Sequence, residues 1–234
     1  NLYNNLLSQY NWGMTCTQLD NIFGELREKI PALVTKITQE KKFRNYMEGM
    51  KIKTSDQEKV GYACLNLLGF DPKKCDLHTA PHPFSTTLGP SDHRITTYYD
   101  EKNFASSLLS TVHEMGHSLY EQGLPQELYG TSVGKYCSLG IHESQSLFWE
   151  KKVGTCKEFL KQLWPVMSKY FSMQEASIDL DKLYYTMNHV KNSLIRVDSD
   201  EVTYSLHIVI RYEMEKLIIN ENLPVEEIKE TWNQ

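Results

Sequence analysis

His113-Glu114-Met115-Gly116-His117 forms the pattern His-Glu-x-x-His, and it lies in a segment whose apolar spacing predicts an amphipathic helix. Residues four apart share one face of a helix, so the imidazoles of His113 and His117 can bind a single zinc ion. Glu114, one position further round the helix, can then reach a water molecule on that metal. The segment therefore predicts two metal ligands and a general base. The alternative is a surface glutamate between two histidines of the core.

The residues around this pattern favour a long helix, called the metal helix below, that packs on a core. Its apolar positions recur at intervals of three and four residues: Phe104, Leu108, Val112, Met115 and Leu119. Gly123 and Pro125 are expected to end the helix. Gly116 is unfavourable inside a helix, by about 1 kcal/mol relative to alanine. Its presence predicts that another backbone packs closely against the metal helix.

A third ligand on the same short segment is excluded, because the metzincin pattern requires glycine at position 120 and histidine at position 123. The chain has Tyr120 and Gly123 at these positions. Further along, the run from Gly140 to Ser146 opens a second predicted helix, with Ser138 or Gly140 near its start. We expect the missing ligand in this second helix.

Glu143 is the expected third ligand. Its neighbour His142 points roughly 100° away on a helix, so only one of the two can face the metal squarely. A set of two histidines and one glutamate leaves the fourth position of zinc for water, as a hydrolase requires. The alternative is a solvated glutamate that the helix dipole favours in the first turn.

The composition is that of an ordinary globular protein, with 40% hydrophobic and 24% charged residues among 234. The net charge of -5 argues against nucleic acid or an anionic membrane as a partner. Five scattered cysteines without a Cys-x-x-Cys pair indicate neither a disulfide framework nor a thiolate zinc site, so we expect a cytoplasmic protein. No apolar run reaches the length of a membrane span. Both ends of the chain resemble cuts through helical sequence, so we expect a piece of a larger protein.

We expect residues 1–234 to form one mainly helical catalytic core with two regions. Residues 1–68 form a helical packing region, and residues 69–234 carry the motifs. Between residues 69 and 94, four prolines exclude a helix and predict a long loop. Residues 95–99 are β-branched and aromatic, which predicts a short strand before the metal helix and an edge for an extended peptide.

The last part of the chain is expected to contain one long helix. Residues 193–197 predict a short strand or a loop, and an amphipathic helix follows from about residue 199 to 219. Asp198 and Glu201, three residues apart, predict a capping box at its start.

Arg196, Tyr204 and His207 are candidate substrate contacts in this part. Arg196 can form two parallel hydrogen bonds with a substrate carboxylate, or it can pair with Asp198 or Asp200. Tyr204 and His207 lie three residues apart on the long helix, so they share a face and can hold an oxyanion. An ordinary helix face explains these two equally well.

His82, Asp92 and Arg94 are further candidates before the metal helix. His82 lies in the proline-rich segment, and Asp92 and Arg94 flank the start of the predicted strand. The alternatives are a surface histidine and a surface ion pair.

Several of these segments together resemble one known family. They are His82-Pro83-Phe84, Asp92-His93-Arg94-Ile95-Thr96-Thr97, His113-Glu114-Met115-Gly116-His117, Tyr120-Glu121-Gln122-Gly123-Leu124-Pro125, Gly140-Ile141-His142-Glu143-Ser144-Gln145-Ser146 and Ile195-Arg196-Val197-Asp198-Ser199-Asp200-Glu201-Val202-Thr203-Tyr204. In this order they resemble the carboxypeptidase Taq family of zinc metallocarboxypeptidases. The resemblance extends from about residue 80 to the end of the chain.

The resemblance implies a mainly α, zincin-like metallopeptidase with a small β-sheet beside the active-site helix. It implies that His113, His117 and Glu143 bind the metal, which is zinc or alternatively cobalt, and that Glu114 is the general base. It implies that Arg196 binds the terminal carboxylate of a peptide substrate.

The resemblance also implies a substrate cleft that includes His82, Asp92 and Arg94, with Tyr204 and His207 in the helix that follows Arg196. Members of the family are longer than this chain and often form homodimers. The expected reaction is hydrolysis of the last bond of a peptide. The alternatives are a zinc endopeptidase of the same helical class and an inactive zinc-binding fragment.

Overall fold

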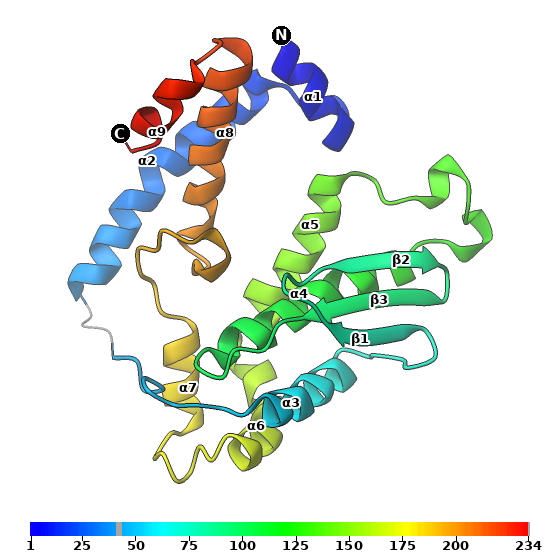
Figure 1. The fold of residues 1–234 in the computed structure, drawn as a ribbon, viewed down its shortest axis with the longest axis vertical. Coiled ribbons are helices and arrows are strands. Elements are labelled where there is room, and N and C mark those ends of the chain that lie inside the picture. The colour runs from blue at the N-terminus through cyan, green and yellow to red at the C-terminus, as the bar shows by residue number, and fades with distance from the viewer. Residues whose placement is uncertain (41–43, 234) are drawn as a thin grey trace. The chain divides into compact units, whose positions relative to one another are not determined.

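A computed structural model describes residues 1–40 and 44–233 of the chain. The described residues are mainly helical and include a three-stranded sheet (Figure 1), in agreement with the predicted fold class. The contacts divide the chain into two compact units, Asn1–Phe43 with His189–Gln234, and Arg44–Asn188. The two ends of the chain thus belong to one unit, and the metal helix belongs to the other.

The unit formed by the two ends of the chain contains the helices α1 (Leu2–Tyr10), α2 (Cys16–Glu40), α8 (Tyr204–Asn220) and α9 (Ile228–Trp232). Tyr3, Cys16 and Tyr212 form the centre of its small core. The hydroxyl of Tyr212 donates to Asp20 over 2.8 Å, which ties α8 to α2. Leu19 and Phe23 of α2 pack on this core, so the helical packing expected for this part of the chain is present.

The start of α8 differs from the sequence prediction. The predicted capping box of Asp198 and Glu201 is wrong, because the helix begins at Tyr204 and its N-cap is Thr203. The carboxylate of Asp200 instead accepts hydrogen bonds from the backbone amides of Val202 and Thr203. Residues 196–198 form a short 3-10 turn, so the loop rather than the strand precedes this helix.

The other unit contains α3 (Thr54–Leu67), α4 (Phe104–Gln122), α5 (Leu139–Leu147), α6 (Lys157–Tyr170) and α7 (Leu180–Met187). The metal helix is α4, and it ends before Gly123 as predicted. Its apolar face is buried in the main hydrophobic core, with Val112 and Met115 fully inaccessible. The amphipathic spacing of the sequence therefore fixes which side of α4 faces away from the core.

The three strands β1 (Cys75–Thr79), β2 (Ser85–Gly89) and β3 (Asp92–Thr97) form one sheet in the order β1-β3-β2. β3 pairs in parallel with β1 and antiparallel with β2. The prediction of a loop over residues 69–94 is therefore wrong in part, since two strands lie in it. Its four prolines all lie outside the strands, where no ladder hydrogen bond is lost: Pro72 precedes β1, and the other three lie in the turns between strands.

The sheet lies along α4 (Figure 1). Thr97 at the end of β3 is fully buried, and its hydroxyl donates to the backbone carbonyl of Ser107 in α4. The predicted strand before the metal helix is thus present as β3. It is the central strand, however, so the edge expected there for a peptide belongs to β2 or β1 instead.

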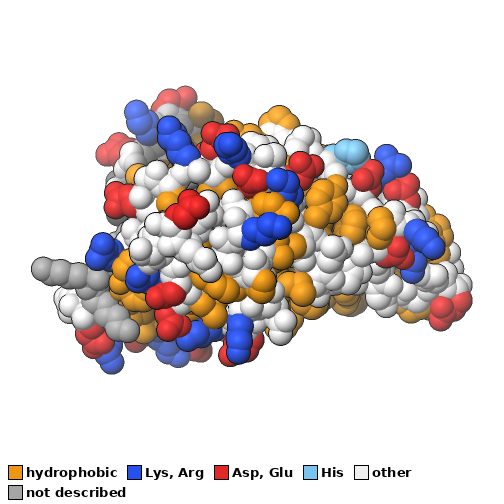
Figure 2. All heavy atoms as spheres, turned by 90° about the horizontal axis from the view of Figure 1, so that it is seen from below, with side chains coloured by type: hydrophobic (Ala, Val, Ile, Leu, Met, Phe, Trp, Pro, Cys, Tyr) orange, Lys and Arg blue, Asp and Glu red, His pale blue; other side chains and the backbone are white. Residues whose placement is uncertain are grey.

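The exposed surface carries charges of both signs. On the face shown in Figure 2, acidic and basic side chains are interspersed among apolar ones. Among the helices of the described part of the chain, none combines the length and the apolar character that a membrane crossing requires.

Candidate metal centre

Three ligand-type side chains converge where α4 meets α5. His113 and His117 come from consecutive turns of α4, and Glu143 comes from α5. One Oε atom of Glu143 lies 3.6 Å from Nε2 of His113 and 3.3 Å from Nε2 of His117. The three candidate donor atoms lie within 4.8 Å of one another. The residues that the sequence predicts as ligands are therefore brought together around one point.

Local sequence explains why Glu143 arrives there. The hydroxyl of Ser138 accepts from the amide of Ile141 and caps α5, so the helix starts shortly before Glu143. Gly116 lets α5 approach α4, because a methyl group at this position would lie 2.8 Å from the Cα of Ser146. The close backbone approach that Gly116 predicts is thus confirmed.

The outer nitrogen atom of each imidazole is also held. Nδ1 of His113 lies 2.8 Å from a carboxylate oxygen of Glu150, while Nδ1 of His117 lies 2.7 Å from Nδ1 of His142. Nε2 of His142 lies 2.9 Å from a carboxylate oxygen of Glu121. These contacts leave both Nε2 atoms directed at the point that Glu143 faces.

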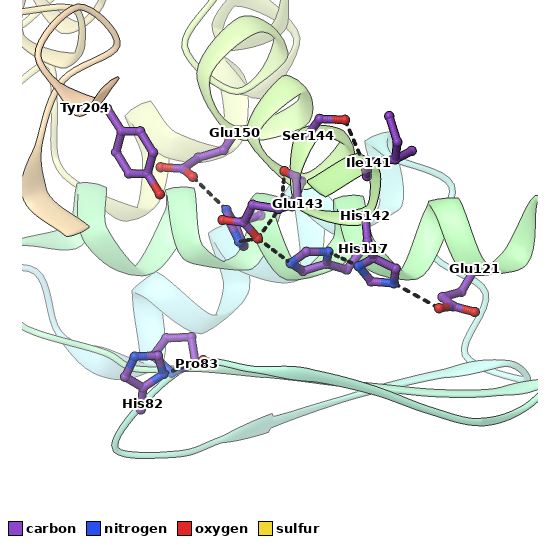
Figure 3. Close-up of polar contacts among 12 residues, drawn as sticks. His82, Pro83, His117, Glu121, Ile141, His142, Glu143, Ser144, Glu150 and Tyr204 are labelled. Carbon is purple, nitrogen blue, oxygen red and sulfur yellow. Dashed lines mark hydrogen bonds and ion pairs between the residues drawn. The ribbon is translucent and has the colours of Figure 1, made fainter. Parts of the chain in front are cut away.

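Figure 3 shows how the acidic groups surround this pair of histidines. Glu143, His117, His142 and Glu121 form one row joined by polar contacts, and Glu150 lies beyond the Glu143 end of that row. His142 does not face the ligand point, as expected for a residue next to Glu143 on a helix. Its ring stacks on His117 with the centroids 4.5 Å apart.

The carboxylates control the charge of His113. Burial lowers the pKa of His113, but the hydrogen bonds with Glu143 and Glu150 outweigh it and raise this pKa to about 10. The hydrogen bonds from His113 and His117 hold the pKa of Glu143 well below its usual range. Burial acts to raise the pKa of Glu150, yet His113 and Lys151 together lower it. The lowered pKa values keep Glu143 and Glu150 negatively charged beside the histidines, as the binding of a cation requires.

Glu114 lies beside the ligand set and has a different environment. It is buried with 7% of its surface exposed, and burial raises the pKa of its carboxyl group. The charges of His113 and His117 and a hydrogen bond with Ser85 of β2 act in the opposite direction. A carboxyl group with a raised pKa next to a metal is suited to accept and return a proton near neutral pH.

The donor set fits a divalent transition metal. Two imidazole nitrogen atoms and one carboxylate oxygen are the ligands typical of catalytic zinc sites, which keep one position open. The seven-residue spacing of Glu143 and Glu150 places both on the same side of the second helix, so that both contact His113. Imidazole donors suit zinc and other late transition metals, so this donor set alone does not choose the ion.

The remaining candidates lie in different parts of the fold. His82 is exposed in the turn between β1 and β2, where its Nδ1 lies 2.7 Å from the carbonyl oxygen of Pro83. Asp92 and Arg94 of β3 form an exposed pair with two hydrogen bonds, of 2.9 and 3.0 Å. Asp92 and Arg94 therefore form the surface ion pair that was predicted from the sequence as the alternative. Their role in substrate binding stays a prediction.

Arg196, Tyr204 and His207 belong to the unit formed by the two ends of the chain. The guanidinium group of Arg196 donates to the hydroxyl of Tyr204 over 2.6 Å. The backbone carbonyl of His207 accepts from Arg211, one turn further along α8. The predicted roles of these three residues in substrate binding stay predictions.

Sequence reasoning missed Glu150 and Glu121 as partners of the histidines. A signal for each was available, because Glu150 follows Glu143 by two helical turns and Glu121 follows His117 by one. The pairing of Glu121 with His142 was hidden, since it joins two helices.

Comparison with known proteins gives the family. The carboxypeptidase Taq (M32) metallopeptidase family matches residues 1–234. Carboxypeptidase 1 of Bacillus subtilis is 39% identical over 99% of this chain and 46% of its own length. Thermostable carboxypeptidase 1 of Thermus thermophilus is 38% identical over 99% of this chain and 45% of its own length.

A solved structure is also similar to this chain. The structure of a Pyrococcus furiosus carboxypeptidase superposes with a TM-score of 0.93 at 35% identity, and the match covers 99% of this chain and 47% of that one. The chain therefore spans about half the length of the relatives it matches. Since the family model matches all of residues 1–234, the chain belongs to the carboxypeptidase Taq (M32) metallopeptidase family.

Proposed function

We propose that the protein containing this chain is a zinc-dependent metallocarboxypeptidase, and that residues 1–234 form its metal-binding catalytic core. One observation carries the proposal. His113, His117 and Glu143 direct their donor atoms at a single point, with Glu114 buried next to them. Membership of the M32 family supplies the reaction class.

His113, His117 and Glu143 would hold the metal ion. When bound, zinc polarises the carbonyl group of the scissile bond and lowers the pKa of a water molecule toward about 7. Glu114 takes the proton of the attacking water and delivers it to the leaving amine. The burial that raises the pKa of Glu114 makes both transfers favourable near neutral pH.

Recognition of the substrate is assigned to residues outside the ligand set. Arg196 would bind the terminal carboxylate of the peptide, and its hydrogen bond with Tyr204 holds one edge of the guanidinium group in place. His82, Asp92 and Arg94 would line the substrate cleft, and β2 offers an edge strand close to α4 for the peptide backbone.

His207, one turn along α8 from Tyr204, is a candidate for holding the oxyanion.

The proposal includes peptide substrates, a cytoplasmic location and assembly as a homodimer, with neither nucleic acid nor a membrane as partner. The five cysteines are all free thiols, which favours a reducing compartment.

The experiment combines metal analysis with peptide digestion read by mass spectrometry. The longest available form of the protein should contain about one zinc ion per chain and should shorten free peptides from the C-terminus. Glu114→Gln should keep the zinc and lose turnover. A variant with near-normal activity would remove Glu114 from the mechanism.

Paired substrates separate this function from its alternatives. Arg196→Ala should raise KM for free-acid peptides and leave cleavage of C-terminally amidated peptides unchanged. Equal cleavage of both substrate types by the unmodified protein would indicate an endopeptidase. Zinc uptake without turnover on any peptide would indicate an inactive zinc-binding fragment.

A further inference from the structure

Among the residues that the structure describes, a histidine and not a carboxylate contacts the outer nitrogen of His117, in contrast to His113. Glu150 contacts Nδ1 of His113 directly, which is the usual way in which proteins orient a metal-binding histidine. Nδ1 of His117 instead contacts Nδ1 of His142, and Nε2 of His142 contacts Glu121. Two imidazole rings and one carboxylate thus form a hydrogen-bonded chain that leads away from the ligand point.

We propose that His142 and Glu121 are positioning residues for His117, and that Glu121, acting through His142, selects the tautomer of His117 that can bind a metal. This inference rests on the proposed metal site. It assigns a role to His142 and Glu121, which neither bind the metal nor transfer a proton in the proposed reaction.

The argument follows from where the hydrogen atoms must be. A contact of 2.7 Å between two ring nitrogens requires one of them to donate and the other to accept. Glu121 as a carboxylate can only accept, so Nε2 of His142 carries a hydrogen atom and donates to it. In the neutral ring of His142, Nδ1 is then an acceptor.

The consequence for His117 is fixed. Since Nδ1 of His142 accepts, Nδ1 of His117 must donate, and the neutral ring of His117 keeps a free lone pair on Nε2. That is the nitrogen atom 3.3 Å from Glu143, at the ligand point. If the hydrogen bonds ran in the opposite direction, Nε2 of His117 would carry the hydrogen atom and could not bind a metal ion.

The packing around His142 and Glu121 holds this hydrogen-bonded chain in one arrangement. The side chains of His142 and Glu121 are 15% and 17% exposed. Besides stacking on His117, the ring of His142 meets Tyr120 and Tyr136 edge-on, with centroids 5.5 and 5.1 Å apart. His142 comes from α5, whereas Glu121 and His117 come from α4, so the chain also ties together the two helices that carry the ligands.

Two variants test the proposal. His142→Phe keeps the stacked ring and removes both nitrogen atoms, and His142→Gln keeps a carbonyl oxygen that can accept from His117. Zinc affinity is measured by competition with a chromophoric chelator. Loss of a group behind a metal ligand commonly weakens affinity by about 10- to 100-fold. We expect that loss for His142→Phe and a smaller one for His142→Gln, and cooperative thermal unfolding of both metal-free variants should show that they are folded.

A third variant, Glu121→Gln, keeps the shape of the side chain and replaces the obligate acceptor by an amide that can also donate. Long-range proton–nitrogen correlation NMR of the imidazoles reports the tautomer directly. In the unmodified metal-free protein Nδ1 of His117 should carry the proton, and in metal-free Glu121→Gln the two tautomers should be mixed.

The outcomes separate the inference from the proposed function. An unmodified protein that takes up no zinc overturns both. If that protein binds zinc while His142→Phe binds it within twofold as tightly, only the role of His142 is overturned. A single unchanged tautomer of His117 in Glu121→Gln overturns the role of Glu121.

Discussion

Gly116→Ala should separate two effects of a methyl group at the contact between α4 and α5. The added carbon atom would lie 2.8 Å from Cα of Ser146, 3.2 Å from the carbonyl oxygen of Gln145 and 3.2 Å from Cβ of Trp149. Carbon atoms in contact prefer about 3.5–4.0 Å. The nearest of these atoms belongs to backbone, so α5 must move by about 1 Å as a unit.

The energies can be set against each other. Alanine gains about 1 kcal/mol over glycine inside a helix. Overpacking of this kind costs about 1–3 kcal/mol, so the free energy of unfolding should fall by about 0–2 kcal/mol. Gly61→Ala is the matched control in the same unit, because its methyl group would meet only the hydroxyl of Tyr99, at 3.8 Å. That variant should be more stable by up to about 1 kcal/mol.

Zinc affinity is the second measurement, since a displaced α5 carries Glu143 with it. Ligand distances in metal sites are held within about 0.2 Å, so a shift of about 1 Å should weaken binding tenfold or more. Urea unfolding of the metal-free variants and chelator competition give the two quantities. The reasoning is refuted if Gly116→Ala is as stable as Gly61→Ala and binds zinc as tightly as the unmodified protein.

Three further predictions concern single contacts. Glu150→Gln should weaken zinc binding by about 10- to 100-fold, and an unchanged affinity in chelator competition would contradict its role behind His113. Tyr204→Phe should raise KM for free-acid peptides more than it lowers kcat, since it removes the partner of Arg196; steady-state kinetics that show only a lower kcat would contradict this. Hydrogen bonds from Lys216 and Tyr212 lower the pKa of Asp20, so its stabilising effect is present above the unfolded-state pKa of about 3.9 and disappears as the pH falls through the lower folded-state value. Because Asp20 is largely exposed, Asp20→Asn should cost less than about 1 kcal/mol of unfolding free energy at pH 7 and less at acidic pH, as urea unfolding over a pH series can show.

The sequence predicts the metal helix well because its signals are local. The apolar spacing from Phe104 to Leu119 reports the buried face, and Gly123 marks the end. Ser138 marks the start of α5 for the same reason, since a capping side chain acts within its own turn.

The strands β1 and β2 could not be found in this way. Each has five residues, and β2 has no buried side chain, so no alternation of apolar and polar residues signals it. Its existence depends on pairing with β3, which only the folded chain provides. At the start of α8 the pattern of Asp198 and Glu201 is present, but Asp200 satisfies the free backbone amides first. Several acidic residues in one turn compete for the same donors, and spacing alone does not choose among them.

The same limit explains what was missed at the metal centre and shows which helix controls it. The metal helix supplies His113 and His117, yet neither side chain is oriented by α4 alone. Glu143, His142 and Glu150 all lie on α5 and the π-helical segment Phe148–Val153 that continues it. One carboxylate completes the proposed ligand set, and the other two groups hold the outer nitrogen atoms. It follows that metal affinity should depend on the packing of α5 against Gly116 as much as on the two histidines, although the familiar pattern lies entirely in α4.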